Sequence, residues 1–197
     1  MKRLLISFKI FLILTLLTGV IYPLIVTGVA QAGFAEKANG SLIITDNKII
    51  GSRLIGQQFD SIIYFSSRPS SISYNPLPSG GSNLGLTNSK LKKLVTERRA
   101  GFVDFNNLDS LTEIPSEMLF SSASGLDPDI SPEASILQVN RISEARNFNY
   151  TQKMQLLQLI EDVTEKPQFS ILGETRLNVL ILNLELDNIQ KIDFNTN

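Results

Sequence analysis

The chain has 197 residues, 43% of them hydrophobic and 19% charged, which is enough for about one domain with an apolar segment added. Its formal net charge of −1 gives no bulk attraction to nucleic acid or to an anionic membrane surface, so no nucleic-acid partner is expected. Cysteine and histidine are both absent, which excludes disulfides, Cys/His zinc sites, cysteine nucleophiles and a Ser-His-Asp triad.

The first element is an apolar segment that predicts a transmembrane helix at residues 10–32. No charged residue lies between Lys9 and Glu36. Residues 10–32 would rise about 35 Å as a helix, slightly more than the ~30 Å hydrocarbon core of a bilayer. The basic residues before the segment are Lys2, Arg3 and Lys9. Because basic residues favour the cytoplasmic side, they predict a cytoplasmic N-terminus at residues 1–9 and an extracytoplasmic domain at residues 33–197.

Pro23 and several small residues mark the middle of this segment. Pro23 lacks a backbone N–H and is expected to kink the helix, with Thr18, Thr27 and Gly19 placed to help satisfy the freed carbonyl. Gly19 and Gly28 would let another helix approach closely and are candidates for a helix–helix interface. One alternative stays open from the residues alone, because Ala30-Gln31-Ala32 has the form of a signal-peptidase site.

Residues 41–87 predict strands followed by a long loop. The sequences SLIIT (41–45), KIIGSRLIG (48–56) and SIIYF (61–65) are rich in isoleucine and predict strands. Prolines and glycines then dominate residues 66–87, and a loop of that length in a compact domain is usually functional or an interface.

Within this loop, residues 74–85 read YNPLPSGGSNLG and contain the paired glycines that a phosphate-binding loop uses. A P-loop also requires Gly-Lys followed by Ser or Thr, and the chain has no Gly-Lys pair. The stretch is therefore interpreted first as a turn, with an anion-binding nest and an interface loop as alternatives.

Helices are predicted after the loop. One begins at Asn88, a good N-cap residue; a second spans residues 131–146, opened by Ser131-Pro132; a third spans residues 151–167. Residues 177–186, LNVLILNLEL, are too apolar to be exposed and predict a buried strand, although periodicity alone leaves a helix open. The predicted fold class is α+β: one N-terminal transmembrane helix followed by a single mixed α+β extracytoplasmic domain.

Ser89 and Lys92 match the S-x-x-K pattern of Ser/Lys hydrolases and would lie near a helix start. The partner motif Lys-Thr-Gly is absent from the chain, and Lys92 stands among other basic residues on a predicted solvated face. From the residues alone, an accessory subunit is favoured, and a free-standing membrane-anchored Ser/Lys hydrolase or an exported binding domain is the alternative.

Blocks of sequence along nearly the whole chain, in this order and spacing, closely resemble the C subunit of the Kdp potassium-transporting P-type ATPase. They are TGVIYPLIVTGVAQ (18–31), NGSLI (39–43), GSRLIGQQF (51–59), YFSSRPS (64–70), YNPLPSGGSN (74–83), SASGLDPDIS (122–131), QVNRISEAR (138–146) and NVLILNL (178–184). The resemblance implies that the N-terminal helix is kept as a membrane span in the bacterial inner membrane.

The resemblance also implies partners and a role. It implies a non-catalytic subunit that works beside a potassium-channel-like subunit, an ATP-hydrolysing subunit and a small membrane peptide, and that helps couple ATP hydrolysis to K⁺ import. This family has been described as a catalytic chaperone that raises the ATP affinity of the hydrolysing subunit. The chain would then bind no cofactor alone and would meet ATP only in a ternary complex with that subunit. Gln138, in the Q-x-x-R block, is the residue that the resemblance links to nucleotide.

The predicted topology conflicts with nucleotide contact, because it places Gln138 and the glycine-rich loop outside the cytoplasm, where ATP is scarce. We therefore expect assembly with the channel-like subunit ahead of a nucleotide role. The loop residues that are candidates for that interface are Arg68, Ser79, Gly80, Gly81 and Asn83. Three roles stay open for Gln138: a buried amide that ties its helix to residues 122–131, contact with a partner subunit, and contact with nucleotide.

Overall fold

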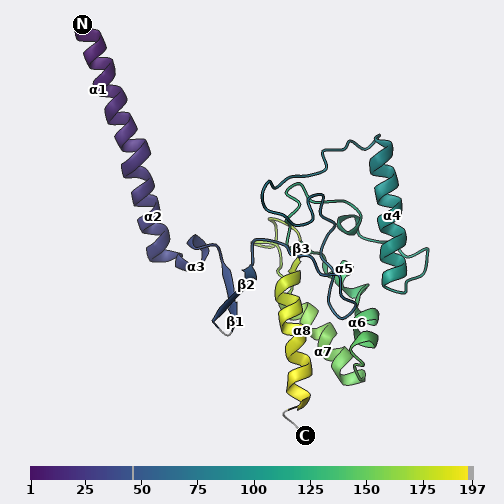
Figure 1. Ribbon diagram of the computed structural model, residues 1–197. Helices are drawn as coiled ribbons and strands as arrows, with labels where there is room; N and C mark the ends of the chain where they lie inside the picture. Colours follow the sequence, from purple (N-terminus) through teal and green to yellow (C-terminus); the bar gives the residue numbers. More distant parts are fainter. Residues whose placement is uncertain (46, 195–197) are drawn as a thin grey trace. The chain divides into compact units, whose positions relative to one another are not determined.

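The computed structural model describes residues 1–45 and 47–194, with side chains described up to Ile189. Asp46 lies outside the described residues. The chain divides into two compact units, with the boundary between Ser52 and Arg53 (Figure 1).

The first unit begins with one continuous helix, Lys2–Gly33, which is long and apolar enough to cross a membrane. It consists of α1 (Lys2–Leu16), a π-helical turn (Leu17–Ile21) and α2 (Tyr22–Gly33). The π-helical turn lies directly before Pro23, where the normal ladder of hydrogen bonds is interrupted. The hydroxyl of Thr18 donates to the carbonyl of Leu14 (2.7 Å), which is a turn earlier than the carbonyl that Pro23 frees. The prediction that the hydroxyl of Thr18 satisfies the carbonyl freed by Pro23 is therefore wrong.

A short helix and a hairpin complete the first unit. They are α3 (Ala35–Ala38), β1 (Leu42–Thr45) and β2 (Lys48–Ser52), and the two strands pair antiparallel. Asn47 follows β1 with φ of 60°, a conformation that asparagine tolerates in tight turns. The second strand ends at Ser52, four residues short of the predicted end at residue 56.

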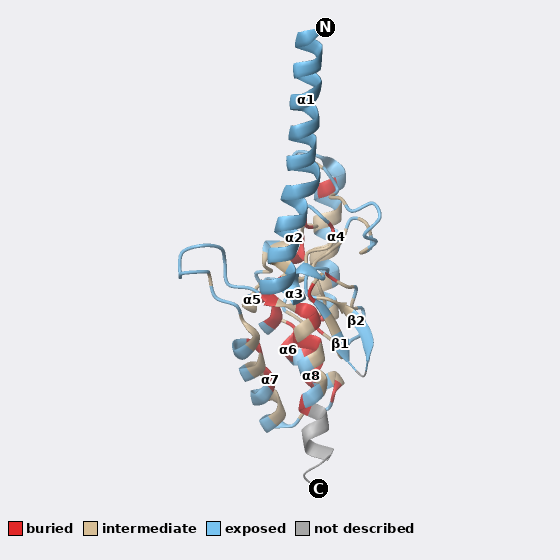
Figure 2. Cartoon of the chain, turned by 90° about the vertical axis from the view of Figure 1, so that its left-hand side faces the viewer, coloured by how far each residue is buried: buried red, intermediate tan, exposed pale blue. Residues whose placement is uncertain are grey.

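The second unit is mainly helical, with one small sheet. Its elements are α4 (Ser89–Phe105), a 3₁₀ turn (Ser116–Met118), β3 (Asp129–Ile130), α5 (Pro132–Ile136), α6 (Val139–Ala145), α7 (Tyr150–Val163), β4 (Leu177–Asn178) and α8 (Val179–Phe194). Strands β3 and β4 pair antiparallel, with Ile130 opposite Leu177. The helices α5 to α8 turn their buried faces toward one another (Figure 2). The chain thus has one N-terminal candidate membrane helix followed by a mixed helix and strand domain, as predicted.

The core of the second unit gathers buried side chains from α5 to α8, and the partly buried Phe102 of α4 packs against it. The buried apolar residues that form it are Phe65, Met118, Ile130, Ala134, Val139, Ile142, Leu156, Ile160, Leu177, Val179, Leu182, Leu186 and Ile189. Phe65 comes from the irregular segment before α4 and is fully buried, so this segment is packed into the core.

The predicted helix starts are confirmed by their caps. The side chain of Asn88 accepts the N–H of Lys90, and the side chain of Ser131 accepts the N–H of Ala134. The third helix starts at Tyr150, one residue before the predicted start. Asn149 and Gln152 cap it reciprocally in a capping box.

The predicted helix 131–146 is wrong in its middle, where it breaks into α5 and α6. The N–H of Gln138 bonds to the carbonyl of Ser135 (2.9 Å), three residues back, so the turn between the helices is of 3₁₀ type. Gln138 nevertheless stays buried, as do Ala134 and Ile142, four residues before and after it.

The predicted buried strand at residues 177–186 is also wrong, since only Leu177 and Asn178 are strand and the rest begins α8. The side chain of Asn178 accepts the N–H of Ile181 (3.1 Å) and so acts as an N-cap. The buried residues of α8 recur mostly at spacings of three and four; they are Val179, Leu180, Leu182, Asn183, Leu186 and Ile189. The segment is apolar because α8 packs in the core of the second unit.

Candidate functional site

Residues 61–66 are held by side chains and not by a neighbouring strand. The predicted strand at 61–65 is therefore wrong: this described segment has no strand, and its backbone groups bond to side chains from residues 138–146 and from α8. The side chains are Gln138, Arg141, Arg146 and Asn183, all buried, and we call them the polar clamp. Because buried backbone N–H and C=O groups need partners, the polar clamp does for this segment what a strand partner does in a sheet.

Arg141 makes the most bonds in the polar clamp. Each of its five N–H donors has an acceptor. The acceptors are the side-chain oxygens of Asn106 and Gln138 and the carbonyl oxygens of Ser61, Ile62 and Tyr64. Its guanidinium also lies over the ring of Phe105, 4.4 Å from the centroid. Burial lowers the pKa of Arg141 to about 10 because desolvation disfavours the charged form, so the side chain is still charged at neutral pH.

Gln138, the residue linked to nucleotide, is 0% exposed, and the chain itself satisfies its amide. Its Oε1 accepts from the N–H of Ser66 (2.8 Å) and from Arg141 (3.1 Å). Its Nε2 lies 3.2 Å from the carbonyl oxygen of Ala134 and 3.4 Å from that of Ser66. Gln138 is thus a buried amide, but it ties its helical turn to Ser66 and not, as expected, to residues 122–131.

The other two members of the polar clamp fix the same segment from its two ends. Nε of Arg146 donates to the carbonyl of Ile63 (2.8 Å), and its NH2 group pairs with Asp187 (2.7 Å). Asn183 binds both backbone groups of Phe65, accepting its N–H (2.8 Å) and donating to its carbonyl (3.0 Å). Paired bonds of this kind are what one strand makes to the next.

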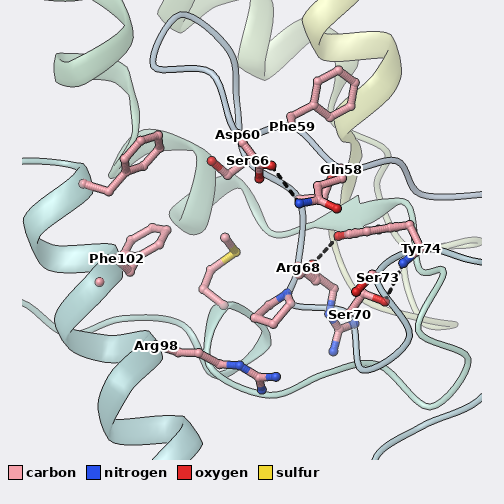
Figure 3. Close-up of a pocket in the computed structure, with 15 residues that line it drawn as sticks. Gln58, Phe59, Asp60, Ser66, Arg68, Ser70, Ser73, Tyr74, Arg98 and Phe102 are labelled. Atoms are coloured by element: carbon pink, nitrogen blue, oxygen red, sulfur yellow. Dashed lines mark hydrogen bonds between the residues drawn. The ribbon is translucent and has the colours of Figure 1, made fainter.

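A cavity of about 420 Å³ lies between α4 and the residues on either side of this segment, 58–60 and 66–74 (Figure 3). Aromatic rings and two arginines line it, among them Phe59, Phe102, Arg68 and Arg98. Arg98 donates to the carbonyl of Leu119 (2.9 Å) and to the hydroxyl of Ser121 (3.0 Å). Rings and guanidinium groups together suit a ligand that is partly flat and partly anionic.

Arg68, one of the predicted interface residues, belongs to this cavity. Its guanidinium pairs with Asp127, and the hydroxyl of Tyr74 donates to its carbonyl. Within the part of the chain that the structure describes, Nε of Arg68 is buried without a hydrogen-bond partner. Burial raises the pKa of Tyr74 to about 12, so its hydroxyl keeps its proton at neutral pH.

The glycine pair of the long loop packs against residues 122–125. The N–H of Gly80 donates to the carbonyl of Ser124 (3.0 Å), and a Cβ at Gly81 would lie only 2.9 Å from the carbonyl oxygen of Ala123. The N–H of Gly80 is therefore already used within the chain. Ser79 and Asn83, on either side of the pair, are exposed.

The remaining candidates are exposed. A Cβ at Gly19 or Gly28 would meet no atom within 4 Å among the described residues of the chain. Ser89 and Lys92 are exposed in the first turn of α4, and neither is among the described residues that line the cavity beside Arg68.

Arg141, Arg146 and Asn183 were not predicted from the sequence as parts of one arrangement. A signal was present, because arginines at 141 and 146 lie at helical spacing with Gln138 and Ile142, inside a stripe that is otherwise apolar. Polar residues on an apolar face indicate either a buried polar network or a partner.

Comparisons with known proteins agree on one family. A family model described as "KdpC: K+-transporting ATPase, c chain" matches residues 4–188. Three relatives named potassium-transporting ATPase KdpC subunit come from Bacillus cereus, Leptospira interrogans and Mycobacterium tuberculosis. The first is 48% identical over 176 residues (89% of this chain, 90% of that protein), the second 41% over 182 residues (92% of each), and the third 44% over 190 residues (95% and 99%). The chain therefore belongs to the KdpC family, the c chain of K⁺-transporting ATPases.

Proposed function

We propose that the chain is a non-catalytic subunit of a potassium-transporting ATPase complex and that it works through contact with the other subunits. The observation that carries this proposal is the reach of the family match, because residues 4–188 include both the apolar helix and the domain. This supports a helix that is retained as a membrane span. The charges of Lys2, Arg3 and Lys9 support an N-terminus in the cytoplasm and a domain outside it, with the helix in the inner membrane.

The proposed partners are a channel-like subunit, an ATP-hydrolysing subunit and a small membrane peptide, with the channel-like subunit as the first contact of the domain. Two features support assembly ahead of a nucleotide role at Gln138. The amide of Gln138 is saturated by Ser66, Ala134 and Arg141. The N–H of Gly80 is used in packing the loop. Exposed Ser79 and Asn83 remain available to a partner protein.

Assembly can be tested on the membrane helix. Gly19 and Gly28 have open space around them, so leucine at either position should leave the chain itself intact while blocking close approach of another helix. We expect Gly28→Leu or Gly19→Leu to reduce co-purification of the other subunits and the potassium-stimulated ATPase activity of the complex by about tenfold. Leu24→Ile, a change on the same helix without added bulk, is the control. Full assembly and activity in both glycine variants would remove this helix face from the proposal.

A second role, raising the ATP affinity of the hydrolysing subunit in a ternary complex, is favoured by one observation. The cavity beside Arg68 has a volume of about 420 Å³ and combines arginines with aromatic rings, which suits a nucleotide.

Gly101 lines this cavity on α4, and a Cβ there would meet no described atom within 4 Å. If ATP enters the cavity, Gly101→Leu should raise the KM for ATP of the complex about tenfold while the melting temperature holds, since leucine favours a helix more than glycine does. Ala100→Leu, exposed and next in sequence, is the control. An unchanged KM would remove the cavity from this role.

A further inference from the structure

The segment between α7 and β4 holds large apolar side chains away from the domain. Phe169 is 86% exposed, Ile171 82% and Leu172 60%. We call residues 168–172 the apolar turn; in Figure 2 the segment that contains it projects beside α7 as an exposed loop. Exposed apolar residues are ordinary when they are scattered, but three within four positions form a patch that needs a reason.

Hydrogen bonds and ion pairs hold the apolar turn in a defined conformation. Glu165 and Arg176 exchange both backbone hydrogen bonds (2.7 and 3.1 Å), and the N–H of Gln168 donates to the carbonyl of Leu172 (2.9 Å). The side chain of Arg176 braces this stem, with Nε 3.1 Å from Asp129 in β3 and NH2 3.1 Å from Glu165. These bonds therefore maintain the conformation in which the three side chains are exposed.

The turn also adopts an unfavourable backbone. Phe169 and Ser170 have φ of 54° and 60°, the left-handed region that bulky side chains rarely occupy. A segment that exposes an aromatic ring and strains its own backbone loses stability on both counts. Such features cluster where a protein contacts a ligand or a partner.

The charges around the turn favour a protein partner over a lipid surface. The charged residues of the segment are Glu165, Lys166, Glu174 and Arg176, which balance. Segments that lie on anionic membranes carry an excess of lysine and arginine. An apolar centre with a rim of mixed charge is instead the usual composition of a protein interface.

The size of the turn indicates what kind of partner it fits. Complete burial of the three side chains would cover on the order of 400 Å², about half of the ~800 Å² that each partner contributes to a standard interface. Such a contact is too small to hold a freely diffusing protein. It becomes effective when another contact already holds the partner nearby, because tethering raises the effective concentration. The membrane helix Lys2–Gly33 can supply that first contact.

We propose that the apolar turn docks into an apolar depression on the channel-like subunit of the potassium-transporting ATPase complex, the proposed first contact of the domain, with Phe169 as the central side chain. The inference rests on the proposed function, because it takes the other subunits of that complex as the partners already held nearby.

A photo-cross-linking amino acid in place of Phe169, in the full chain co-expressed with the other subunits, tests this contact. We expect a covalent product with the channel-like subunit on irradiation, and a product only with a different subunit would overturn the inference. The same amino acid in place of Leu111, which is 87% exposed in the loop after α4, is the matched control and should give little product. Products only with lipid, only with a second copy of this chain, or equal to those of the control would overturn the inference.

Phe169→Gly separates docking from folding. Glycine is at ease at φ of 54°, so this change should keep or raise the melting temperature while it removes the ring. We expect co-purification of the other subunits to fall about tenfold. Undiminished co-purification would overturn the inference while leaving the proposed function intact. If the unmodified chain itself brought down no other subunit, the proposed function would fail, which is a distinguishable result.

Discussion

Replacing Arg141 by alanine should lower the free energy of unfolding by about 3–5 kcal/mol, because several buried acceptors lose their donor at once and each costs ~1–3 kcal/mol non-additively. The groups left without a donor include the carbonyls of Ile62 and Tyr64 and the side-chain oxygen of Asn106. The melting temperature of the full chain in detergent should fall by about 10 °C or more.

Two further variants define this result. Arg141→Lys keeps the charge but not the planar fork of five donors, so its loss should be intermediate. Lys92→Ala, on the exposed face of α4, should change the melting temperature very little. If Arg141→Ala melted with the parent chain, the polar clamp would not hold residues 61–66 as described.

Gln138→Ala should lower the free energy of unfolding by about 1–3 kcal/mol, because its neighbours lose both an acceptor and a donor. The groups affected are the N–H and C=O of Ser66, the C=O of Ala134 and one N–H of Arg141. We expect the KM for ATP of the assembled complex to stay unchanged, since the amide is bonded within the chain. Melting of the full chain and ATPase kinetics of the complex, measured on the same variant, check both statements.

The other roles of Gln138 give different results in this experiment. Contact with nucleotide would leave melting and assembly normal and raise the KM for ATP. Contact with a partner subunit would leave melting normal and weaken co-purification. Gln155→Ala, an exposed glutamine on α7, controls for the loss of a glutamine as such.

Local signals in the sequence predicted the helices well. The caps at Asn88 and Ser131 are side chains that bond to N–H groups two or three residues away, so their physics is contained in a few adjacent residues. The apolar helix at the N-terminus is likewise a matter of length and composition.

Two segments were wrongly predicted as strands, because a sequence pattern that indicates burial does not determine which secondary structure is buried. Residues 177–186 are mostly apolar, which indicates burial without distinguishing a central helix from a central strand. Asn178 as an N-cap, with buried positions three and four apart after it, was the available sign of a helix.

The strand predicted at residues 61–65 was wrong for a different reason. Their backbone partners are side chains far along the chain, and Asn183 lies 118 positions after Phe65. No local pattern shows that side chains will replace a strand. The same distance hid the candidate site: Gln138 stood out in the sequence, but its partner Ser66 could come only from the fold.

The proposed assembly with the channel-like subunit requires that the domain lie outside the cytoplasm, and one measurement tests this directly. The chain has no cysteine, so a single Ser79→Cys change places one reactive thiol on the exposed loop. In sealed right-side-out vesicles, a membrane-impermeant maleimide should label this variant at once, whereas Ser7→Cys, near the N-terminus, should be labelled only after detergent is added. Protection of Ser79→Cys together with immediate labelling of Ser7→Cys would place the domain in the cytoplasm and contradict the account.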